Sequence, residues 1–168
     1  MQANETNGSL PLLYVDDSAD YRALVKEAIL LTGTHFAFYE ADGMESAVPY
    51  LQSDGLSKQH PRPALILLDY DLGDHTAADF LYWLRLIKKI SSIPVVVFGG
   101  SVDTRNIAEC YSTGANNFIS KPIDLARLKI IVRTLHLGLV SLNRQGPIRF
   151  LQEYQPDPRK HAMMAELS

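Results

Sequence analysis

Cysteine is almost missing from this chain of 168 residues, since Cys110 is its single example. One cysteine excludes an intramolecular disulfide and any metal site built from several thiolates. Neither sign of charge dominates, because 16 basic and 19 acidic side chains leave a formal net charge of -3. The net charge therefore gives no reason to expect nucleic-acid binding, although it is compatible with a local basic patch.

Long apolar runs are also lacking. The most apolar stretch, residues 130–142, is interrupted by Arg133 and His136 and is too short to span a bilayer. Residues 1–9 have neither the basic start nor the apolar core of a signal peptide. We therefore expect a cytoplasmic protein without a membrane partner. A disordered stretch, 1–9, should precede one compact domain over 10–140. The C-terminal extension, 141–168, could dock as a short helix, mediate self-association or fray.

Short apolar runs alternate with segments of helical period, which is typical of an α/β fold with a parallel sheet between two layers of helices. The expected strands are residues 12–15, 35–39, 65–68, 93–98 and 117–119. The expected helix caps are Ser18, Thr76 or Asp74, Ser101 and Asp124. The helix that follows Ser18 should carry Tyr21 on its apolar face and stop at Gly33. Pro49 predicts a shortened or kinked helix over residues 44–51, because proline lacks the N–H that the helix needs.

Two of the apolar runs end in carboxylates. Asp16 and Asp17 follow the first run, and Asp69 closes the third. The carboxyl ends of parallel strands share one edge of the sheet, where open α/β sheets bind ligands. Three carboxylates gathered there would resist joint ionisation unless a divalent cation lay between them. Oxygen ligands favour Mg²⁺, Mn²⁺ or Ca²⁺ over zinc. An acidic pair on its own is more often a helix cap. The interpretation of Asp16 and Asp17 as part of a metal site therefore depends on Asp69 lying at the same edge of the sheet.

The same edge should receive Lys121 and the turn Gly99-Gly100-Ser101, which follow the last two strands. A carboxylate held by a divalent cation is a competent nucleophile toward phosphorus. The Lys121 ammonium and the backbone N–H groups near the two glycines could then neutralise the phosphoryl oxygens. The sequence therefore predicts a site that receives and holds a phosphoryl group on Asp69.

Four segments have an order and spacing that resemble those of a known protein family. They are residues 14–18 (YVDDS), 65–69 (LILLD), 94–97 (PVVV) and 114–122 (GANNFISKP). Over residues 10–140 the chain thereby resembles the receiver domain of two-component response regulators, of the single-domain type. The spacing around residues 52–63 is also similar to that of the small receivers paired with bacterial phytochrome kinases. The resemblance implies a flavodoxin-like (βα)5 three-layer sandwich with a five-stranded parallel sheet in the order 2-1-3-4-5. It also implies phosphoryl transfer from a histidine kinase, with Mg²⁺ required.

The resemblance assigns roles to individual positions. Asp69 is implied as the phosphoacceptor, and Lys121 as the partner of the phosphate. Asp17 and Asp69 are implied as direct Mg²⁺ ligands, while Asp16 acts mostly through water. The backbone carbonyl of Asp71 is the remaining protein ligand that the resemblance implies.

Two positions depart from the family pattern. Gly99 stands where the family has Thr or Ser, whose hydroxyl binds phosphoryl and draws the loop inward. Ser101 could replace that hydroxyl only if the loop were rearranged. Phe118 stands at the switch aromatic, often a tyrosine, so a phenolic hydrogen bond is lost as well. Asp71 is an acid at a position that varies in the family, where it could attract water and shorten the phosphate's lifetime or simply add charge.

Three functions remain open at this point. The first is a phosphorylation-controlled interaction module without enzymatic turnover beyond its own phosphorylation and dephosphorylation, and without a DNA-binding domain. Its partners would be a sensor histidine kinase or histidine phosphotransfer protein, an unidentified target, and a second copy of the chain through Ile107, Tyr111 and Leu139. The second is a phosphorylation-independent scaffold whose switch has decayed at Gly99. The third is a haloacid-dehalogenase-type phosphatase, suggested by Asp69-Tyr70-Asp71, although that motif should follow the first strand.

Overall fold

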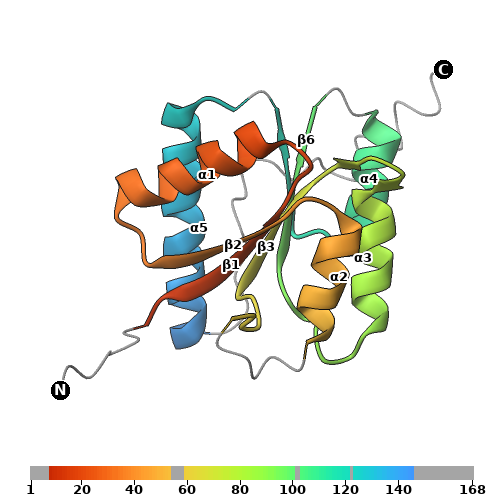
Figure 1. Ribbon diagram of the computed structural model, residues 1–168, viewed down its shortest axis with the longest axis horizontal. Coiled ribbons are helices and arrows are strands. Elements are labelled where there is room, and N and C mark those ends of the chain that lie inside the picture. The colour runs from red at the N-terminus through yellow and green to blue at the C-terminus, as the bar shows by residue number, and fades with distance from the viewer. Residues whose placement is uncertain (1–7, 54–58, 101–102, 122, 146–168) are drawn as a thin grey trace.

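Five parallel strands form a central sheet, with helices packed on both faces (Figure 1). This computed structural model describes residues 8–53, 59–100, 103–121 and 123–145, the last six of them by backbone alone. The sheet contains β1 (Leu10–Val15), β2 (Phe36–Ala41), β3 (Leu65–Asp69), β6 (Val95–Gly99) and β7 (Asn117–Ser120). The helices are α1 (Ala19–Thr32), α2 (Met44–Gln52), α3 (Ala77–Leu86), α4 (Thr104–Ser112) and α5 (Leu125–Gln145).

The strand order, β2-β1-β3-β6-β7, confirms the predicted order 2-1-3-4-5 and with it the predicted three-layer fold. All neighbouring strands in this sheet are parallel. A small antiparallel hairpin, β4 (Asp71–Leu72) with β5 (His75–Thr76), was not predicted from the sequence. Gly73 turns this hairpin with a φ of 76°, a conformation that side chains with a Cβ rarely adopt.

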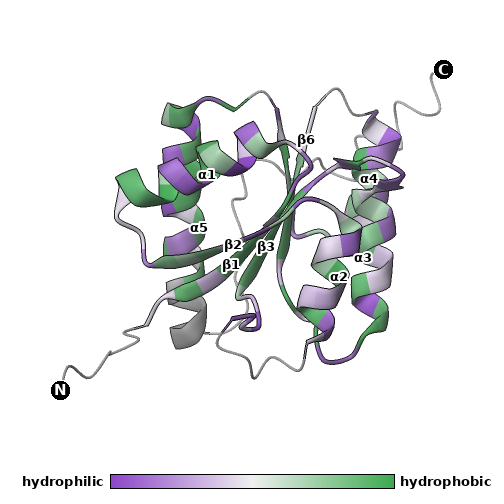
Figure 2. Cartoon of the chain, viewed as in Figure 1, coloured by the Kyte–Doolittle hydropathy of each residue, from purple (hydrophilic) through white to green (hydrophobic). Residues whose placement is uncertain are grey.

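The core lies on both sides of the sheet because successive strand residues point to opposite faces. Leu12 and Tyr14 of β1 face the layer made by α1 and α5, whereas Leu13 and Val15 face α2, α3 and α4. Every residue of β3 and β6 is buried, which explains their apolar runs without polar alternation. Figure 2 shows these strands as the hydrophobic centre of the molecule.

Most predicted helix ends are confirmed. Ser18 caps α1, which ends at Gly33 with a φ of 62°. Thr76 caps α3 and forms a reciprocal capping box with Asp79. The backbone N–H of Arg127 donates to Asp124 at the start of α5.

The prediction that Ser101 caps the fourth helix is wrong. Asp103 is the cap of α4 and accepts the backbone N–H of Arg105 at 2.9 Å. Aspartate serves as well as serine in this role, so the helix begins two residues later than the sequence suggested. The α2 helix runs through Pro49 to Gln52 and is therefore not shortened. The α5 helix continues to Gln145, five residues beyond position 140. The predictions for residues 1–7 and 146–168 lie outside the described residues.

Candidate functional site

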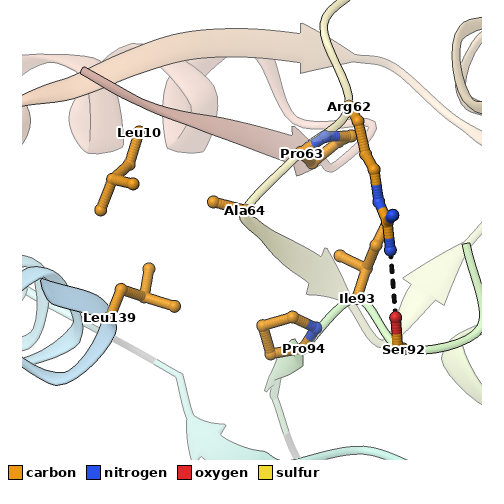
Figure 3. Close-up of a pocket in the computed structure, with 8 residues that line it drawn as sticks. All are labelled: Leu10, Arg62, Pro63, Ala64, Ser92, Ile93, Pro94 and Leu139. Carbon is orange, nitrogen blue, oxygen red and sulfur yellow. Dashed lines mark hydrogen bonds between the residues drawn. The ribbon is translucent and has the colours of Figure 1, made fainter. Parts of the chain in front are cut away.

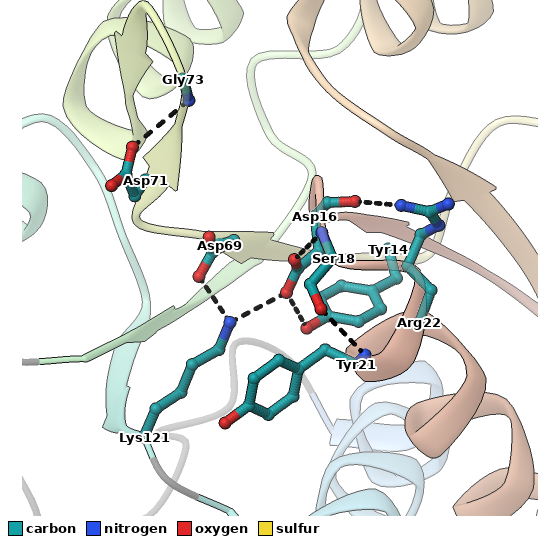
Figure 4. Close-up of polar contacts among 9 residues, drawn as sticks. All are labelled: Tyr14, Asp16, Ser18, Tyr21, Arg22, Asp69, Asp71, Gly73 and Lys121. Atoms are coloured by element: carbon teal, nitrogen blue, oxygen red, sulfur yellow. Dashed lines mark hydrogen bonds and ion pairs between the residues drawn. The ribbon is translucent and has the colours of Figure 1, made fainter.

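Three carboxylates and one ammonium group meet at the carboxyl edge of the sheet. Figure 4 shows two of these carboxylates, Asp16 and Asp69, with the ammonium group of Lys121. Asp69 ends β3, Asp16 and Asp17 follow β1, and Lys121 follows β7. The Lys121 Nζ lies 2.7 Å from Asp69 Oδ1 and 2.9 Å from Asp16 Oδ2. Residues 105 positions apart in the chain are thus joined directly, as the parallel sheet predicted.

Asp16 is fully buried and held from several sides. Its Oδ1 accepts the backbone N–H of Ser18 at 2.8 Å, and its Oδ2 accepts both Lys121 Nζ and the Tyr14 hydroxyl. Arg22 donates to the Asp16 backbone carbonyl at 2.6 Å, which fixes the turn between β1 and α1. Because a carboxylate has about four lone-pair positions, three donors leave Asp16 little capacity for a direct metal contact.

Lys121 is placed by the backbone as well as by its charge. Its N–H donates to the carbonyl of Gly99 at 2.6 Å, so the end of β6 fixes the point at which the lysine leaves the sheet. Its side chain is only 11% exposed. The aromatic ring of Tyr21 lies beside the ammonium, with its centroid 3.9 Å from Nζ. This arrangement shields the ion pairs from water, which strengthens them.

Burial governs the protonation of the site. Loss of hydration raises the pKa of Asp69, the Lys121 hydrogen bond lowers it, and the negative charges of Asp16 and Asp17 add to the rise, which prevails. Burial lowers the pKa of Lys121, but its hydrogen bonds to Asp69 and Asp16 outweigh that effect and raise it overall. The lysine therefore stays charged at neutral pH, whereas burial and the neighbouring carboxylates disfavour the ionised form of Asp69. A carboxylate with a raised pKa is a stronger nucleophile when it is ionised.

The donor set fits a hard divalent cation. One carboxylate oxygen from each of Asp16, Asp17 and Asp69 can be chosen so that all three lie within 4.8 Å of one another. Two ligands on opposite sides of Mg²⁺ lie about 4.2 Å apart, so small side-chain movements would complete such a site. Asp17 is exposed, whereas Asp69 is buried and keeps 7% of its surface accessible. Lys121 donates to Oδ1 of Asp69, and within the described part of the chain no donor reaches Oδ2.

Other predicted site residues contribute no side chain to this cluster. The exposed Asp71 carboxylate accepts the N–H of Gly73 and is not one of the clustered carboxylates, as Figure 4 shows. Gly99 ends β6 as a buried residue, and Gly100 is exposed beyond it. The proposed phosphate role of Ser101 falls outside the described residues.

Phe118 is buried in β7 and packs against the α2–α3–α4 side of the sheet. Its ring lies 6.4 Å from that of Tyr70, which directly follows Asp69 in the chain. Its backbone N–H donates to the Tyr111 hydroxyl at 3.0 Å, so a tyrosine from α4 supports this strand. Among the residues named for self-association, Leu139 is only 5% exposed and packs into the core, so it cannot contribute to an interface.

Neither Tyr14 nor Tyr21 was predicted from the sequence to belong to this site. A signal for Tyr14 was present, because residues two apart on a strand point the same way and Tyr14 precedes Asp16 by two. Tyr21 was assigned only to the buried face of a helix. Its contact with Lys121 depends on how α1 and β7 pack and has no local sequence signal.

The opposite edge of the sheet contains a hollow of a different kind (Figure 3). Leu10, Ala64 and Pro94, near the amino ends of three strands, line it together with Leu139 of α5. Arg62 closes one side by donating to the Ser92 hydroxyl at 3.0 Å. Its lining is mainly apolar and lacks a carboxylate, so it offers none of the chemistry gathered at the carboxyl edge.

Comparison with known proteins gives a family match. Residues 12–133 match the model of the response regulator receiver domain. Response regulator Rcp1 of Synechocystis is 31% identical over 128 residues, covering 75% of this chain and 86% of that protein. The Escherichia coli phosphate regulon transcriptional regulatory protein PhoB is 28% identical over 158 residues, and the match spans 92% of this chain but only 63% of PhoB.

Solved structures give the same result. The phosphorylated cyanobacterial phytochrome response regulator RcpA aligns with a TM-score of 0.70 and 25% identity, covering 84% of this chain and all of that one. The Mn²⁺-bound form of Rcp1 aligns with a TM-score of 0.68 at 24% identity, covering 83% of this chain and 99% of that one, and supports the fold alone. No helix within the described residues has the length and apolar character needed to cross a membrane.

Proposed function

The chain belongs to the response regulator receiver family, and on this premise we propose that it accepts a phosphoryl group on Asp69 from a histidine kinase. The observation that carries the proposal is the placement of Lys121 Nζ between Asp69 and Asp16, with Asp17 in the same cluster. This arrangement supplies a nucleophile, a fixed positive charge and an oxygen donor set at one edge of the sheet.

The transfer step is a substitution at phosphorus. A carboxylate oxygen of Asp69 forms a bond to phosphorus while the bond from phosphorus to the donor atom breaks. The electron pair of that bond leaves with the donor, which is a histidine nitrogen of the kinase or the acetate of acetyl phosphate. Oδ2 suits the attack because Lys121 already binds Oδ1. Lys121 is positioned to stabilise the charge of the phosphoryl oxygens.

Mg²⁺ is the cofactor that we propose for this site. Asp17 and Asp69 would hold it directly, and Asp16, whose oxygens are already occupied by donors, would contribute through water. When bound, the cation would relieve the repulsion among the carboxylates and neutralise phosphoryl oxygens. The Asp71 backbone carbonyl remains the proposed third direct protein ligand.

Mass spectrometry of the intact protein tests the proposal. Incubation with acetyl phosphate and Mg²⁺ should add one phosphoryl group to the wild type and none to Asp69→Asn. Asp71→Asn is the matched control, because it removes a nearby carboxylate that lies outside the cluster, and it should still be labelled. Labelling of Asp69→Asn would refute the assignment of the acceptor. Consumption of acetyl phosphate without a mass increase would favour a phosphatase.

A second candidate function follows from Gly99. This residue ends β6 at the edge of the site and has no hydroxyl to bind phosphoryl. The chain could therefore be a scaffold that binds its partner whether or not Asp69 is modified. In the same assay, a complete absence of labelling in the wild type would support this second function.

The partners remain part of the proposal. We propose a sensor histidine kinase or histidine phosphotransfer protein upstream, and a target protein bound through the receiver surface downstream. The likeness to RcpA, a phytochrome response regulator, makes a phytochrome-type kinase the first candidate to test. We further propose a cytoplasmic location and no catalytic turnover beyond self-phosphorylation from small donors and self-dephosphorylation.

A further inference from the structure

The Lys121 ammonium is confined on three sides. Two carboxylates accept hydrogen bonds from it, Asp69 at 2.7 Å and Asp16 at 2.9 Å. The third side is covered by the ring of Tyr21, whose centroid lies 3.9 Å from Nζ. A cation at this distance over an aromatic ring is attracted by the negative face of the ring. Figure 4 shows the ring beside the end of the lysine, with its hydroxyl pointing away from the carboxylates.

The start of α1 brings Tyr21 to this place. Ser18 caps the helix and accepts the backbone N–H of Tyr21 at 3.3 Å, which puts the tyrosine in the first turn. Helical side chains lean toward the amino end of their helix, and here that end joins the carboxyl edge of β1. The ring therefore reaches over the edge of the sheet, where it also packs against the core layer beneath α1.

We propose that Tyr21 is a positioning residue that holds the Lys121 ammonium over the Asp16–Asp69 pair through the face of its aromatic ring. Its importance for phosphoryl transfer rests on the function proposed above. The role belongs to the ring and not to the hydroxyl, because the hydroxyl points away from the ion pairs.

The chemistry of the site explains why an aromatic ring is useful there. Lys121 must exchange a carboxylate contact for a phosphoryl contact when Asp69 becomes an acyl phosphate, because the Oδ1 that Lys121 binds is then a neutral carbonyl oxygen and the negative charge lies on the phosphoryl group. A carboxylate in place of the ring would compete with the phosphoryl oxygens for the same N–H groups. A ring face attracts the cation without forming so strong a hydrogen bond, so it can hold the lysine before and after the transfer.

Two substitutions at one position test the proposal. Tyr21→Phe keeps the ring, and Tyr21→Leu removes it while leaving an apolar side chain. The initial rate of labelling by acetyl phosphate and Mg²⁺ should be unchanged in Tyr21→Phe and should fall about threefold to tenfold in Tyr21→Leu. Tyr82→Leu, which removes an exposed ring from α3, is the matched control and should keep the wild-type rate. Equal rates for the two Tyr21 variants, or a slow Tyr21→Phe, would overturn the proposal.

A second measurement needs neither metal nor phosphodonor. The ε-methylene protons of Lys121, assigned with Lys121→Met, should be shifted upfield by the ring in the wild type and in Tyr21→Phe. In Tyr21→Leu that shift should disappear, and its persistence would show that the ring does not hold the lysine. If the wild type were not labelled at all, the proposed function would fail, and this NMR shift would still decide the role of Tyr21. Urea unfolding of each variant confirms that the compared proteins are folded.

Discussion

Tyr14→Phe is the sharpest test of how the buried carboxylate is stabilised. The change removes one oxygen from a fully buried side chain whose hydroxyl donates to Asp16. The ring remains, and so does its edge-on contact with Phe98, at a centroid separation of 6.0 Å. Asp16 keeps its bonds from Ser18 and Lys121, so the variant isolates a single donor.

The expected cost follows from the charge of the acceptor. A hydrogen bond to a charged group contributes about 1.5–3 kcal/mol, and Asp16 has no exposure through which water could replace the lost donor. The free energy of unfolding should therefore fall by about 1.5–3 kcal/mol. For a domain of this size that loss lowers the urea midpoint by roughly 1 M.

The pH dependence provides a second readout. Burial, together with the hydrogen bond to Asp16, raises the pKa of Tyr14 well above its ordinary value of 10.0. As pH rises past 10, the unfolded chain loses this proton while the folded protein keeps it, so stability falls with pH. In Tyr14→Phe that contribution is absent. The variant should lose stability less steeply above pH 10 than the wild type.

Urea unfolding followed by circular dichroism, without divalent cations and from pH 7 to 11, measures both effects. Tyr82→Phe is the control, because Tyr82 is 64% exposed and its hydroxyl should not affect stability. A Tyr14→Phe midpoint equal to that of the wild type would show that water or Lys121 fully replaces the phenol. An unchanged slope above pH 10 would refute the assigned cause of the pKa shift.

The remaining predictions concern Lys121, the contact between Arg85 and Gly114, and the thiol of Cys110. Lys121→Met removes the cation between two buried carboxylates and should cost about 3–5 kcal/mol in urea unfolding at pH 7. The loss should shrink at lower pH or with Asp69→Asn added, and an equal loss there would contradict the charge argument. Arg85 donates to three backbone carbonyls, including that of Gly114 at 2.6 Å, so Arg85→Met should cost about 3 kcal/mol. A Cβ at Gly114 would lie 2.6 Å from Arg85 Nε, so Gly114→Ala should be less damaging when combined with Arg85→Met, and strict additivity would argue against this contact. Cys110 is fully buried and burial raises the pKa of its thiol to about 11, so alkylation at pH 8 should be about 100-fold slower in the folded protein than in urea, and similar rates would refute its burial.

Much of the fold was predictable because its signals are local. The uninterrupted apolar runs at β3 and β6 require burial on both faces, and that requirement alone selects a central parallel strand. Ser18 and Gly33 marked the ends of α1 through capping and left-handed backbone chemistry that depends only on neighbouring residues. The error at Ser101 arose where two capping residues, Ser101 and Asp103, stand close together and local chemistry does not choose between them.

The acidic cluster was predictable for a different reason. Parallel strands fix which ends lie together, so the positions of Asp16, Asp69 and Lys121 after their strands were enough to bring them to one edge. The same rule could not exclude the Asp71 side chain, because the β4–β5 hairpin that turns it toward Gly73 is made of two-residue strands without a periodic signal.

The sequence by itself determined the alternation of strands and helices, their buried faces and the edge at which the charged groups meet, whereas the strand order followed from the resemblance to the receiver family. Tertiary structure alone decided the surroundings of those groups: the ring of Tyr21 beside Lys121, and the lysine bonded to Asp16 as well as Asp69. Periodicity specifies which face of an element is buried, whereas contacts between side chains depend on the distance and angle at which helix and sheet pack. Those quantities arise from the whole core and are encoded in no short segment of the chain.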